Sequence, residues 1–409
     1  MRYYVETYGC TMNFGEGREL AEDMASLGYS EAMSAEDADI VIINTCTVVE
    51  TTEKRMLSRI SELKKMGKEV IVTGCLAKVQ PKRVEIRLPG APIVPPEEYH
   101  NFSNLVMERY GIAGPPVPAT YHKDAILPIA QGCLGNCTYC ITKFARGNLR
   151  SYPEDSIKRR FDAFVDAGSS EILITSQDTA CYGFDTGTTL PELLHLLLRK
   201  DGDYRIRIGM MNPNFLERIC DDLLDVMEDP RVYRFLHIPV QSGSDRVLSE
   251  MHRHYTREEF MTLVRKIRSR IPDVSIATDL ICGFPGETDE EHAMSVNLIR
   301  ELRADTVNIT RFSPRQGTAA FSMPQVHGRI SAARSAELTE VKNETEYDVN
   351  GAMVGKVYSA LATETGKDGT ILRTDNYRPV VVREDVPLGT RVSVEVTDRR
   401  PTYLIGRIV

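Results

Sequence analysis

The stretch Cys133-Leu134-Gly135-Asn136-Cys137-Thr138-Tyr139-Cys140 spaces three cysteines as C-x3-C-x2-C, directly after the apolar run Ile126–Ala130. A short, bounded apolar run is typical of a buried parallel strand. In α/β folds with parallel sheets, the reactive groups lie at the carboxyl ends of the strands. The stretch therefore predicts a β/α fold with cysteine chemistry at the end of its first strand.

Three thiolates this close in sequence can hold three irons of a 4Fe–4S cluster and leave the fourth iron open. An open coordination position is what chemistry at a metal requires. The alternative is structural zinc, which takes four ligands, commonly as two pairs, but no fourth Cys or His lies nearby. We predict an iron–sulfur site at Cys133, Cys137 and Cys140, with zinc as the alternative.

Downstream of this triplet, the chain repeats a strand followed by an amphipathic stretch six times. The predicted strands are Ile126–Ala130, Glu171–Thr175, Arg205–Met210, Phe235–Val240, Ser275–Ile281 and Thr306–Phe312. Six such units predict a partial (β/α)6 barrel over residues 124–328, although an open sheet has the same pattern. A polar connecting helix is predicted over 329–350.

Upstream, residues 1–120 alternate β-branched runs with the helical stretches Phe14–Leu27 and Glu53–Met66. Strands that alternate with helices predict a doubly wound parallel sheet. The Pro/Gly-rich segment 111–119 predicts a linker. Beyond the connecting helix, residues 351–409 hold short β-rich runs between Gly and Asp turns, which predicts a small antiparallel β-barrel.

A second cysteine set lies in the N-terminal region, where Cys10, Cys46 and Cys75 each follow a predicted strand. Because the carboxyl ends of neighbouring parallel strands meet at one sheet edge, these three residues can converge on one point. The alternative for any one of them is a buried apolar residue. Their shared position favours a second three-cysteine cluster, whereas Cys181, Cys220 and Cys282 lack the pattern and are predicted to be structural.

The composition agrees with a globular protein and limits the location. The chain has 409 residues, nine cysteines and a net charge of −8. It has no apolar run long enough for a membrane helix and no secretory signal at its start, so we expect no membrane association and a cytoplasmic location. There, cysteines bind metals or act in catalysis more often than they form disulfides. The negative charge argues against a general nucleic-acid binder and leaves a local RNA patch open.

Several segments resemble the radical S-adenosylmethionine (SAM) methylthiotransferase family, in the expected order and over nearly the whole chain. They are Thr7–Asn13, Asn44–Val48, Gly74–Ala77, Gln131–Gly147, His237–Ser244 and Asp279–Thr288. The resemblance implies an N-terminal methylthiotransferase domain with an auxiliary cluster, a radical SAM core and a C-terminal TRAM-like RNA-binding barrel.

The same resemblance implies two 4Fe–4S clusters and SAM as cofactors. In the family, the open iron of the core cluster binds SAM, and its cleavage yields a 5′-deoxyadenosyl radical. A second SAM donates a methyl group to sulfur at the auxiliary cluster. The run Cys140–Gly147 is most similar to the archaeal and eukaryotic branch, which converts N6-threonylcarbamoyladenosine beside the tRNA anticodon to its 2-methylthio derivative. The alternatives are isopentenyladenosine in tRNA or a ribosomal protein as substrate, or a non-catalytic RNA-binding protein with zinc.

Further cofactor-binding residues are expected at strand ends and beside the cluster loop. By resemblance, Tyr139 lies against the adenine of SAM. Ser176, Gln177 and Asp178 take the place of a Gly-Gly-Glu motif found in many relatives, with a loop cap as the alternative. By the same resemblance, Gln241 and Asp279 are candidates for the ribose or the substrate, with a satisfied polar residue in the barrel interior as the alternative. Lys143 and Arg146 are candidates for the SAM carboxylate or an RNA phosphate, with solvated surface as the alternative.

The expected partners follow from the same resemblance. They are the tRNA anticodon stem-loop, an electron-donating protein and a sulfur source, while the oligomeric state is open. In the predicted barrel, the residues offered for phosphate contacts and base stacking are Arg373, Arg378, Arg391, Arg399, Arg400 and Arg407, with Tyr377 and Tyr403. A solvated charged face is the alternative for this dispersed set.

Overall fold

The computed structural model describes residues 1–48, 50–118 and 123–409. The chain forms two compact units. Unit 1 comprises residues 1–122, 131–135 and 140–150, and unit 2 comprises 123–130, 136–139 and 151–409. The cysteine loop after residue 130 is thus shared between the units.

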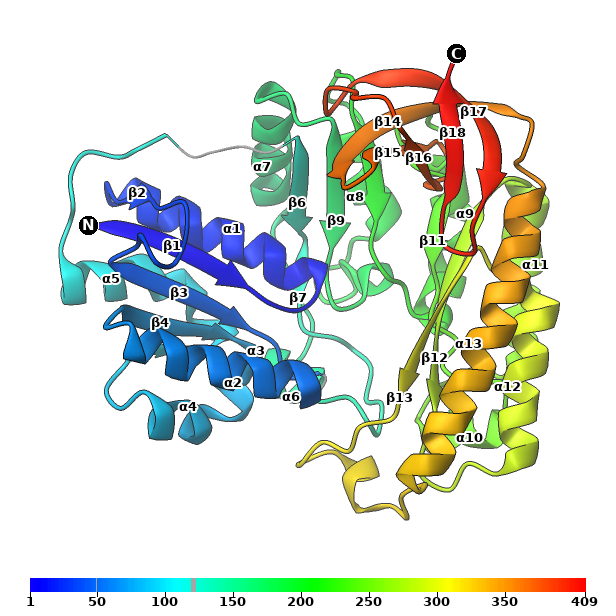
Figure 1. The fold of residues 1–409 in the computed structure, drawn as a ribbon, viewed down its shortest axis with the longest axis horizontal. Helices are drawn as coiled ribbons and strands as arrows, with labels where there is room; N and C mark the ends of the chain where they lie inside the picture. Colours follow the sequence, from blue (N-terminus) through cyan, green and yellow to red (C-terminus); the bar gives the residue numbers. More distant parts are fainter. Residues whose placement is uncertain (49, 119–122) are drawn as a thin grey trace. The chain divides into compact units, whose positions relative to one another are not determined.

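Unit 1 is built on a five-stranded, fully parallel sheet in the order β2-β1-β3-β4-β5 (Figure 1). Its strands are β1 (Arg2–Thr7), β2 (Ser30–Glu31), β3 (Ile40–Thr45), β4 (Glu69–Gly74) and β5 (Ile93–Val94). Its helices are α1 (Thr11–Ser26), α2 (Glu50–Lys65), α3 (Cys75–Val79), α4 (Pro81–Arg87), α5 (Phe102–Tyr110) and α6 (Thr142–Arg146), with a 3₁₀ turn at Pro96–Asn101. Along the chain, β2 is added on one side of β1, and β3, β4 and β5 are added on its other side. Doubly wound sheets bind ligands at the point where the strand order changes side in this way.

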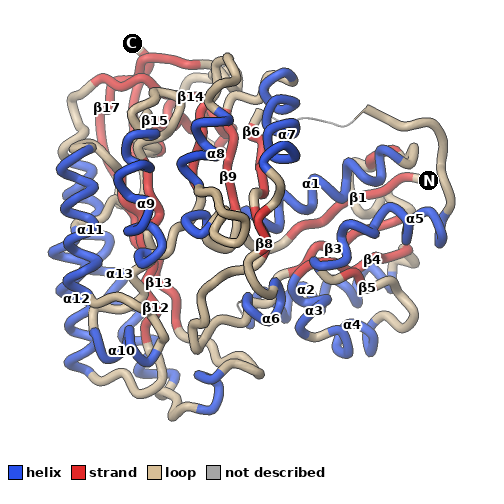
Figure 2. Tube along the Cα trace, turned by 180° about the vertical axis from the view of Figure 1, so that it is seen from behind, coloured by secondary structure: helices blue, strands red, loops and turns tan. Residues whose placement is uncertain are grey.

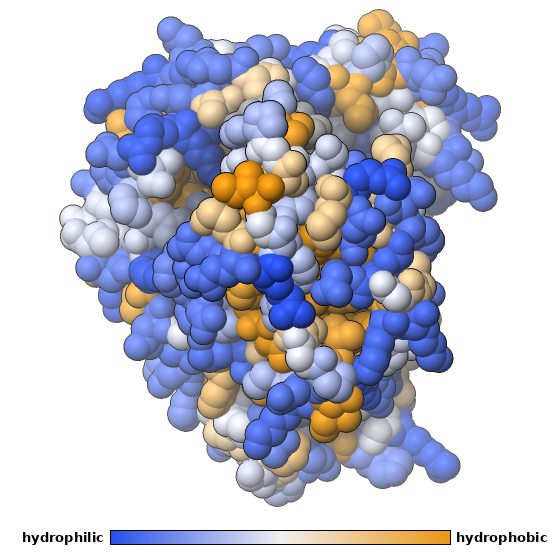
Figure 3. Space-filling view, turned by 90° about the vertical axis from the view of Figure 1, so that its left-hand side faces the viewer, coloured by the Kyte–Doolittle hydropathy of each residue, from blue (hydrophilic) through white to orange (hydrophobic). Residues whose placement is uncertain are grey.

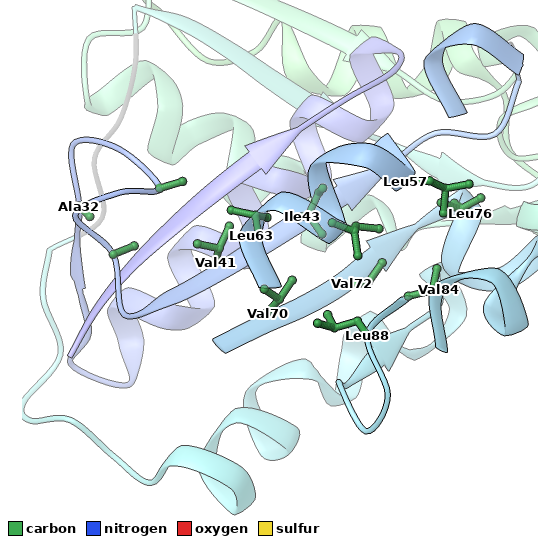
Figure 4. Packing of buried hydrophobic residues seen from close by; sticks show 13 residues of the cluster. Ala32, Val41, Ile43, Leu57, Leu63, Val70, Val72, Leu76, Val84 and Leu88 are labelled. Atoms are coloured by element: carbon green, nitrogen blue, oxygen red, sulfur yellow. The ribbon is translucent and has the colours of Figure 1, made fainter. Parts of the chain in front are cut away.

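Two apolar layers hold the sheet of unit 1 between helices. Every residue of β3 is buried, as expected for a central parallel strand covered on both faces. On one face, Val41 and Ile43 pack with Val70 and Val72 against Leu57 and the rest of a 13-residue cluster (Figure 4). The other face packs against α1 and α5. The predicted linker has neither helix nor strand over 111–118, and residue 119 lies outside the described part.

Unit 2 begins with six parallel strands, each near its predicted position. They are β6 (Asp124–Pro128), β9 (Glu171–Thr175), β10 (Arg205–Ile208), β11 (Phe235–His237), β12 (Ser275–Cys282) and β13 (Thr306–Arg311). The ladders form two groups, β10-β9-β6 and β11-β12-β13. A hydrogen bond from Met211 N to His237 O, 2.9 Å long, joins the segments after β10 and β11. The strands therefore follow one another in sequence order, which confirms the partial barrel.

Helices lie outside these strands (Figure 2). They are α7 (Glu154–Asp166), α8 (Leu190–Leu197), α9 (Pro213–Val226), α10 (Asp245–Glu250), α11 (Arg257–Arg270) and α12 (Asp289–Leu302), with 3₁₀ turns at Thr179–Cys181 and Ala319–Ser322. Capping boxes at Thr256 and Thr288 fix the starts of α11 and α12, because each threonine and the glutamate three residues later satisfy backbone N–H groups at the helix start. The short strands β7 (Ala130–Gln131) and β8 (Arg150–Ser151) pair with each other.

The connecting helix α13 (Gly328–Gly351) leads into a closed five-stranded barrel. Its strands are β14 (Val357–Gly366), β15 (Gly369–Thr374), β16 (Pro379–Val382), β17 (Arg391–Arg399) and β18 (Leu404–Ile408). The predicted barrel is confirmed with one difference. Its ladders are antiparallel except for β16 and β18, which pair in parallel to close the barrel.

One face of the molecule is shown by hydropathy in Figure 3. On the face in Figure 3, hydrophilic residues predominate and the hydrophobic ones occur in small separate groups, as is usual for solvated protein surface. Within the described residues, none of the helices is both long and apolar enough to cross a membrane.

Candidate functional site

The three N-terminal cysteines follow three adjacent strands, as predicted. Cys10 follows β1, Cys46 follows β3 and Cys75 follows β4, and β1, β3 and β4 are neighbours in the sheet. The registers pair Thr7 with Asn44 and Thr45 with Gly74, so the strand ends are level. The topology thus brings all three cysteines to one sheet edge.

Two glycines allow these strand ends to approach closely. Gly9 has a φ of 116°, and a Cβ at this position would lie 2.9 Å from both Cys46 Cβ and Asn13 Nδ2. Gly74 has a φ of 87° and lies against the backbone of Thr45. Positive φ and absent side chains are glycine properties, so each residue before Cys10 and Cys75 permits a contact that other residues would block.

The thiols of this set influence one another. Burial raises the pKa of Cys75 to about 11, Cys46 and Cys10 add to the rise, and the Arg146 guanidinium opposes it. Burial also raises the pKa of Cys46, with a further contribution from Cys10. Mutual repulsion of this kind requires proximity. Metal binding would remove the protons, because thiolate is the ligand form.

Asn13 and Arg146 complete this site in unit 1. Asn13 Nδ2 donates to Tyr8 O at 2.8 Å and to Thr45 O at 2.9 Å, and its Oδ1 accepts from Arg146 Nη2 at 2.8 Å. Arg146 Nε lies 3.2 Å from Cys75 Sγ, and both Nη groups bind the Glu16 carboxylate. The protein partners of Arg146 in the structure are thus Asn13, Glu16 and Cys75, and its role at the SAM carboxylate or an RNA phosphate stays a prediction.

The loop of the second triplet is anchored separately in each unit. In unit 1, Lys143 Nζ donates to Cys133 O, and Gly135 N lies 3.2 Å from Cys133 Sγ. Lys143 thus binds the loop carbonyl. In unit 2, Thr138 N and Oγ1 donate to Met251 O at 3.2 Å and Glu250 O at 2.8 Å. These contacts fix the loop on both sides of Cys137.

Arg253 approaches the central cysteine of this loop. Its Nη1 lies 3.3 Å from Cys137 Sγ, its Nε donates to Tyr255 Oη at 2.9 Å, and its Nη2 donates to Pro239 O at 3.2 Å. Sequence reasoning missed Arg253, which lies 116 residues beyond Cys137. No spacing or periodicity marks it, and the contact exists only because the segment after α10 folds back to the loop.

An aromatic cluster surrounds Tyr139 in unit 2. Its ring lies 6.4 Å from that of Phe284 in an edge-on arrangement, and Phe284 lies 5.5 Å from Phe312. Met251 and Val247 pack into the same cluster. Tyr139 is therefore positioned by apolar contacts from the loops at the strand ends.

The segment after β9 places one unpaired carboxylate oxygen in the interior. Asp178 Oδ1 accepts from Ala180 N at 3.2 Å and Asn212 N at 3.1 Å, so it caps the following 3₁₀ turn. Its Oδ2 is buried and has no hydrogen-bond partner among the described residues. Burial raises the pKa of Asp178 to about 6, against the lowering effects of Asn212 N–H and the Arg253 charge. Ser176 Oγ accepts from Asp178 N at 3.1 Å and so supports this segment.

Gln241 lies four residues after β11, and Asp279 lies within β12. Gln241 has a φ of 75°, an uncommon conformation for a residue other than glycine and one that clusters at functional sites. Asp279 Oδ1 binds His237 Nε2 at 2.9 Å and Asn308 Nδ2 at 2.8 Å. Although burial alone would raise the pKa of Asp279, these partners hold it below its ordinary value. Asp279 is therefore ionised at neutral pH.

Among the described residues, no group of three or more His, Cys, Asp or Glu side chains is arranged to hold a metal ion. A four-iron cluster spaces its thiolates more widely than a single ion does, so the cluster predictions stay predictions. The donor chemistry fits a cluster, because thiols converge at one sheet edge and N–H groups point at their sulfurs. Cys181, Cys220 and Cys282 are buried, in agreement with a structural role.

The barrel arginines are largely committed to protein partners. Arg378 is buried and pairs with Asp305 at 2.8 Å, while Arg373 pairs with Glu364 at 3.0 Å. Tyr377 packs on Tyr233 and Phe235 of the core. The other arginines pair with Asp203 (Arg391), Asp398 (Arg400) and Glu395 (Arg407), or stack on the Tyr347 ring (Arg399). Part of the set therefore joins the barrel to the core.

Family models match three segments of the chain. They are the Radical SAM superfamily at residues 127–299, Uncharacterized protein family UPF0004 at 2–94, and the TRAM domain at 351–409. The N-terminal sheet and the closed barrel fall within their matches, and the Radical SAM match covers the core from within β6 to α12, whereas β13 lies beyond its end.

Relatives align over the whole chain. The "Probable threonylcarbamoyladenosine tRNA methylthiotransferase" of Archaeoglobus fulgidus is 40% identical over 100% of this chain and 99% of its own. The protein of the same name from Pyrococcus abyssi is 37% identical over 100% of both chains. The "Threonylcarbamoyladenosine tRNA methylthiotransferase" of Drosophila melanogaster is 34% identical over 100% of this chain and 78% of its own.

Solved structures share the fold at low identity. The radical S-adenosylmethionine methyltransferase TsrM of Kitasatospora setae, with cobalamin and a 4Fe–4S cluster bound, has a TM-score of 0.59 at 15% identity, covering 78% of this chain and 77% of its own. The cobalamin-dependent radical enzyme OxsB has a TM-score of 0.53 at 11% identity, covering 83% and 56%. These likenesses support the architecture described above.

Proposed function

The chain belongs to the threonylcarbamoyladenosine tRNA methylthiotransferase family, and we propose that it converts N6-threonylcarbamoyladenosine beside the tRNA anticodon to its 2-methylthio derivative. The observation that carries this proposal is the whole-length match to archaeal and animal relatives of that name. The match to the TRAM domain agrees with an RNA substrate. Neither isopentenyladenosine nor a ribosomal protein is favoured by these relatives, and the radical SAM match speaks against a non-catalytic zinc protein.

We assign the two cysteine triplets to two clusters. Cys133, Cys137 and Cys140 hold the 4Fe–4S cluster that the radical SAM family uses with SAM. Cys10, Cys46 and Cys75 hold an auxiliary 4Fe–4S cluster, which is supported by their adjacent strand ends and mutually raised thiol pKa values. When bound, these groups supply the 5′-deoxyadenosyl radical and a site for the transferred sulfur.

The domains of this proposal follow the sequence boundaries. Residues 1–120 form the auxiliary-cluster domain, 124–328 the radical SAM core, 329–350 the connecting helix and 351–409 the TRAM-like barrel. The three family matches fall inside the first, second and fourth of these ranges. An electron-donating protein and a sulfur source complete the reaction, and the expected location is the cytoplasm.

The chain's own residues bind and orient SAM in this proposal. Asp178 Oδ2, buried and unpaired, accepts from the ammonium of the methionine part, with Ser176 and Gln177 beside it. The backbone and aromatic cluster of Tyr139 lie against the adenine. Gln241, after β11, and Asp279, within β12, act on the ribose or the substrate. Lys143 holds the loop carbonyl of Cys133.

Asp178→Asn is expected to weaken SAM binding roughly 10- to 100-fold. This range corresponds to the free energy of a hydrogen bond to a charged group, about 1.5–3 kcal/mol. Because the carboxylate form accepts from the ammonium, wild-type affinity should fall as the pH drops through about 6. The variant should show no such dependence. Equilibrium binding of SAM to the reconstituted protein between pH 5 and 8 measures both effects.

The same variant should bind SAM more weakly but have a more stable fold than the wild type at high pH. Folding raises the pKa of Asp178 above its ordinary 3.8, so this carboxyl favours the folded state below that pH and loses this contribution as pH rises towards about 6. Asp178→Asn should therefore have a higher thermal midpoint than the wild type, and this difference should be larger at pH 8 than at pH 5. The control is Asp221→Asn, because Asp221 is exposed and forms a surface ion pair with Lys266. SAM affinity that is unchanged in Asp178→Asn contradicts the assignment.

The activity is tested on tRNA that differs in one nucleoside. The reconstituted protein, SAM, a reductant and sulfide as the sulfur source are incubated with tRNA that carries threonylcarbamoyladenosine, isopentenyladenosine or unmodified adenosine at the modified position. Mass analysis of the digested nucleosides should show the methylthio derivative with the first tRNA alone. Product on the isopentenyladenosine tRNA alone would overturn the substrate assignment.

A further inference from the structure

Each cysteine triplet has one thiol that lies beside an arginine. Arg146 Nε is 3.2 Å from Cys75 Sγ within unit 1, and Arg253 Nη1 is 3.3 Å from Cys137 Sγ within unit 2. The arginines come from segments with no sequence relation to each other. Since each contact is made inside one unit, each concerns one triplet alone.

Arg146 is held in one orientation. Its side chain is 1% exposed and that of Glu16 is 2% exposed. Glu16 takes both Nη groups, and Asn13 Oδ1 takes Nη2 as well, which leaves Nε–H directed at Cys75. A buried ion pair is a weak source of stability, because desolvation offsets the attraction. The pair with Glu16 instead fixes the guanidinium so that Arg146 Nε–H points at Cys75 Sγ.

Arg253 is held by different groups. Tyr255 Oη and Pro239 O accept from Nε and Nη2, and Nη1 remains for Cys137. Tyr255 in turn donates to Val240 O at 2.9 Å. The loop after β11 and the segment after α10 therefore fix this guanidinium together.

A cationic N–H donor to a cysteine ligand stabilises negative charge on sulfur. A cluster gains one negative charge when it accepts an electron, and hydrogen bonds to its sulfurs are one determinant of its reduction potential. We propose that Arg146 and Arg253 are positioning residues that separately raise the reduction potentials of the auxiliary and radical-generating clusters, through Cys75 and Cys137. This inference rests on the proposed function, in which both triplets bind clusters.

The position of Arg146 in the chain adds a connection. It ends α6, six residues after Cys140, and both residues belong to unit 1. The loop of one triplet thus carries the donor to the other triplet. Movement of α6 would change the donor to Cys75 and the end of the Cys133–Cys140 loop together.

The test uses the full chain, reconstituted without oxygen, in four forms. They are wild type, Glu16→Gln/Arg146→Met, Arg253→Met and the control Arg59→Met, whose arginine pairs with Glu6 at 3.0 Å in unit 1. The double variant removes both charges of the buried pair, so no unpaired charge remains and any change in potential reports the loss of the N–H donor. Iron and sulfide are counted first. Dithionite, a one-electron donor, then reduces each form in a titration followed by electron paramagnetic resonance, and the signal that changes on adding SAM marks the radical-generating cluster.

The double variant should lower the potential of the SAM-insensitive signal alone, by at least a tenfold change in the reduction equilibrium, ~59 mV for one electron. Arg253→Met should lower the SAM-sensitive signal alone, and Arg59→Met should change neither. Full iron content with unshifted potentials overturns the inference. Wild type with about four irons would instead overturn the two-cluster function. If the double variant loses its cluster, Glu16→Gln/Arg146→Gln decides, because glutamine keeps a neutral N–H donor but removes the cationic charge, and an unshifted potential there overturns the inference.

Discussion

Replacing Cys10, Cys46 and Cys75 together with alanine is expected to lower the iron content from about eight to about four per chain. The three residues follow the adjacent strands β1, β3 and β4, so their removal takes away every proposed protein ligand of the auxiliary cluster. SAM and a reductant should still yield 5′-deoxyadenosine, since Cys133, Cys137 and Cys140 are intact. Methylthio nucleoside should fall below detection.

The matched control is Cys220→Ala. Cys220 is buried in α9 of unit 2 and was predicted to be structural. Its replacement should leave the iron content at about eight, with a modest loss of stability from the small cavity. If the N-terminal triple variant also keeps about eight irons, the residues at this sheet edge are structural and the auxiliary cluster lies elsewhere.

The reciprocal variant, Cys133→Ala/Cys137→Ala/Cys140→Ala, is expected to abolish radical formation. Iron should again fall to about four, but now 5′-deoxyadenosine should be absent and no methylthio product should form. Because the auxiliary site is unchanged, transfer of the methyl group from SAM to sulfur should continue and release S-adenosylhomocysteine. The two triple variants thus separate the two uses of SAM.

Chromatography of the small-molecule products measures this second prediction. Cys282→Ala is its control, as Cys282 is buried at the end of β12 and outside both triplets. The control should form both SAM products. Persistent 5′-deoxyadenosine in the core triple variant would contradict the role assigned to Cys133, Cys137 and Cys140.

Much of the fold was predictable because it depends on local pattern. Most of the six core strands are short, largely apolar runs bounded by turns, and all six lie near their predicted positions. The adjacency of Cys10, Cys46 and Cys75 followed from one rule, that parallel strands end at one sheet edge. The rule needs only the order of strands and helices, which the sequence carries.

The start of α1 was not predictable in this way. The pattern placed the helix at Phe14, but α1 begins at Thr11. Thr11, Met12 and Asn13 join the helix because Asn13 binds the carbonyls of Tyr8 and Thr45, at the ends of two strands. The start of α1 is therefore set by the tertiary contacts of Asn13 and not by the spacing of apolar residues along the helix.

The arginines beside the thiols were also beyond sequence reasoning. Arg146 meets Glu16 across 130 residues, and Arg253 meets Cys137 across 116. Neither pair has a spacing that a motif describes. In the barrel, Arg378 looked like an RNA contact, but it is buried against Asp305. Charge in a sequence does not distinguish a solvated arginine from one that joins two domains.

In the proposed function, one chain couples two uses of SAM to methylthiolate one tRNA nucleoside. The most direct measurement quantifies S-adenosylhomocysteine, 5′-deoxyadenosine and the methylthio nucleoside in a single reaction with tRNA that carries threonylcarbamoyladenosine. We predict equal amounts of the three products. Formation of 5′-deoxyadenosine without S-adenosylhomocysteine or methylthio nucleoside, in protein that holds about eight irons, would contradict the claim.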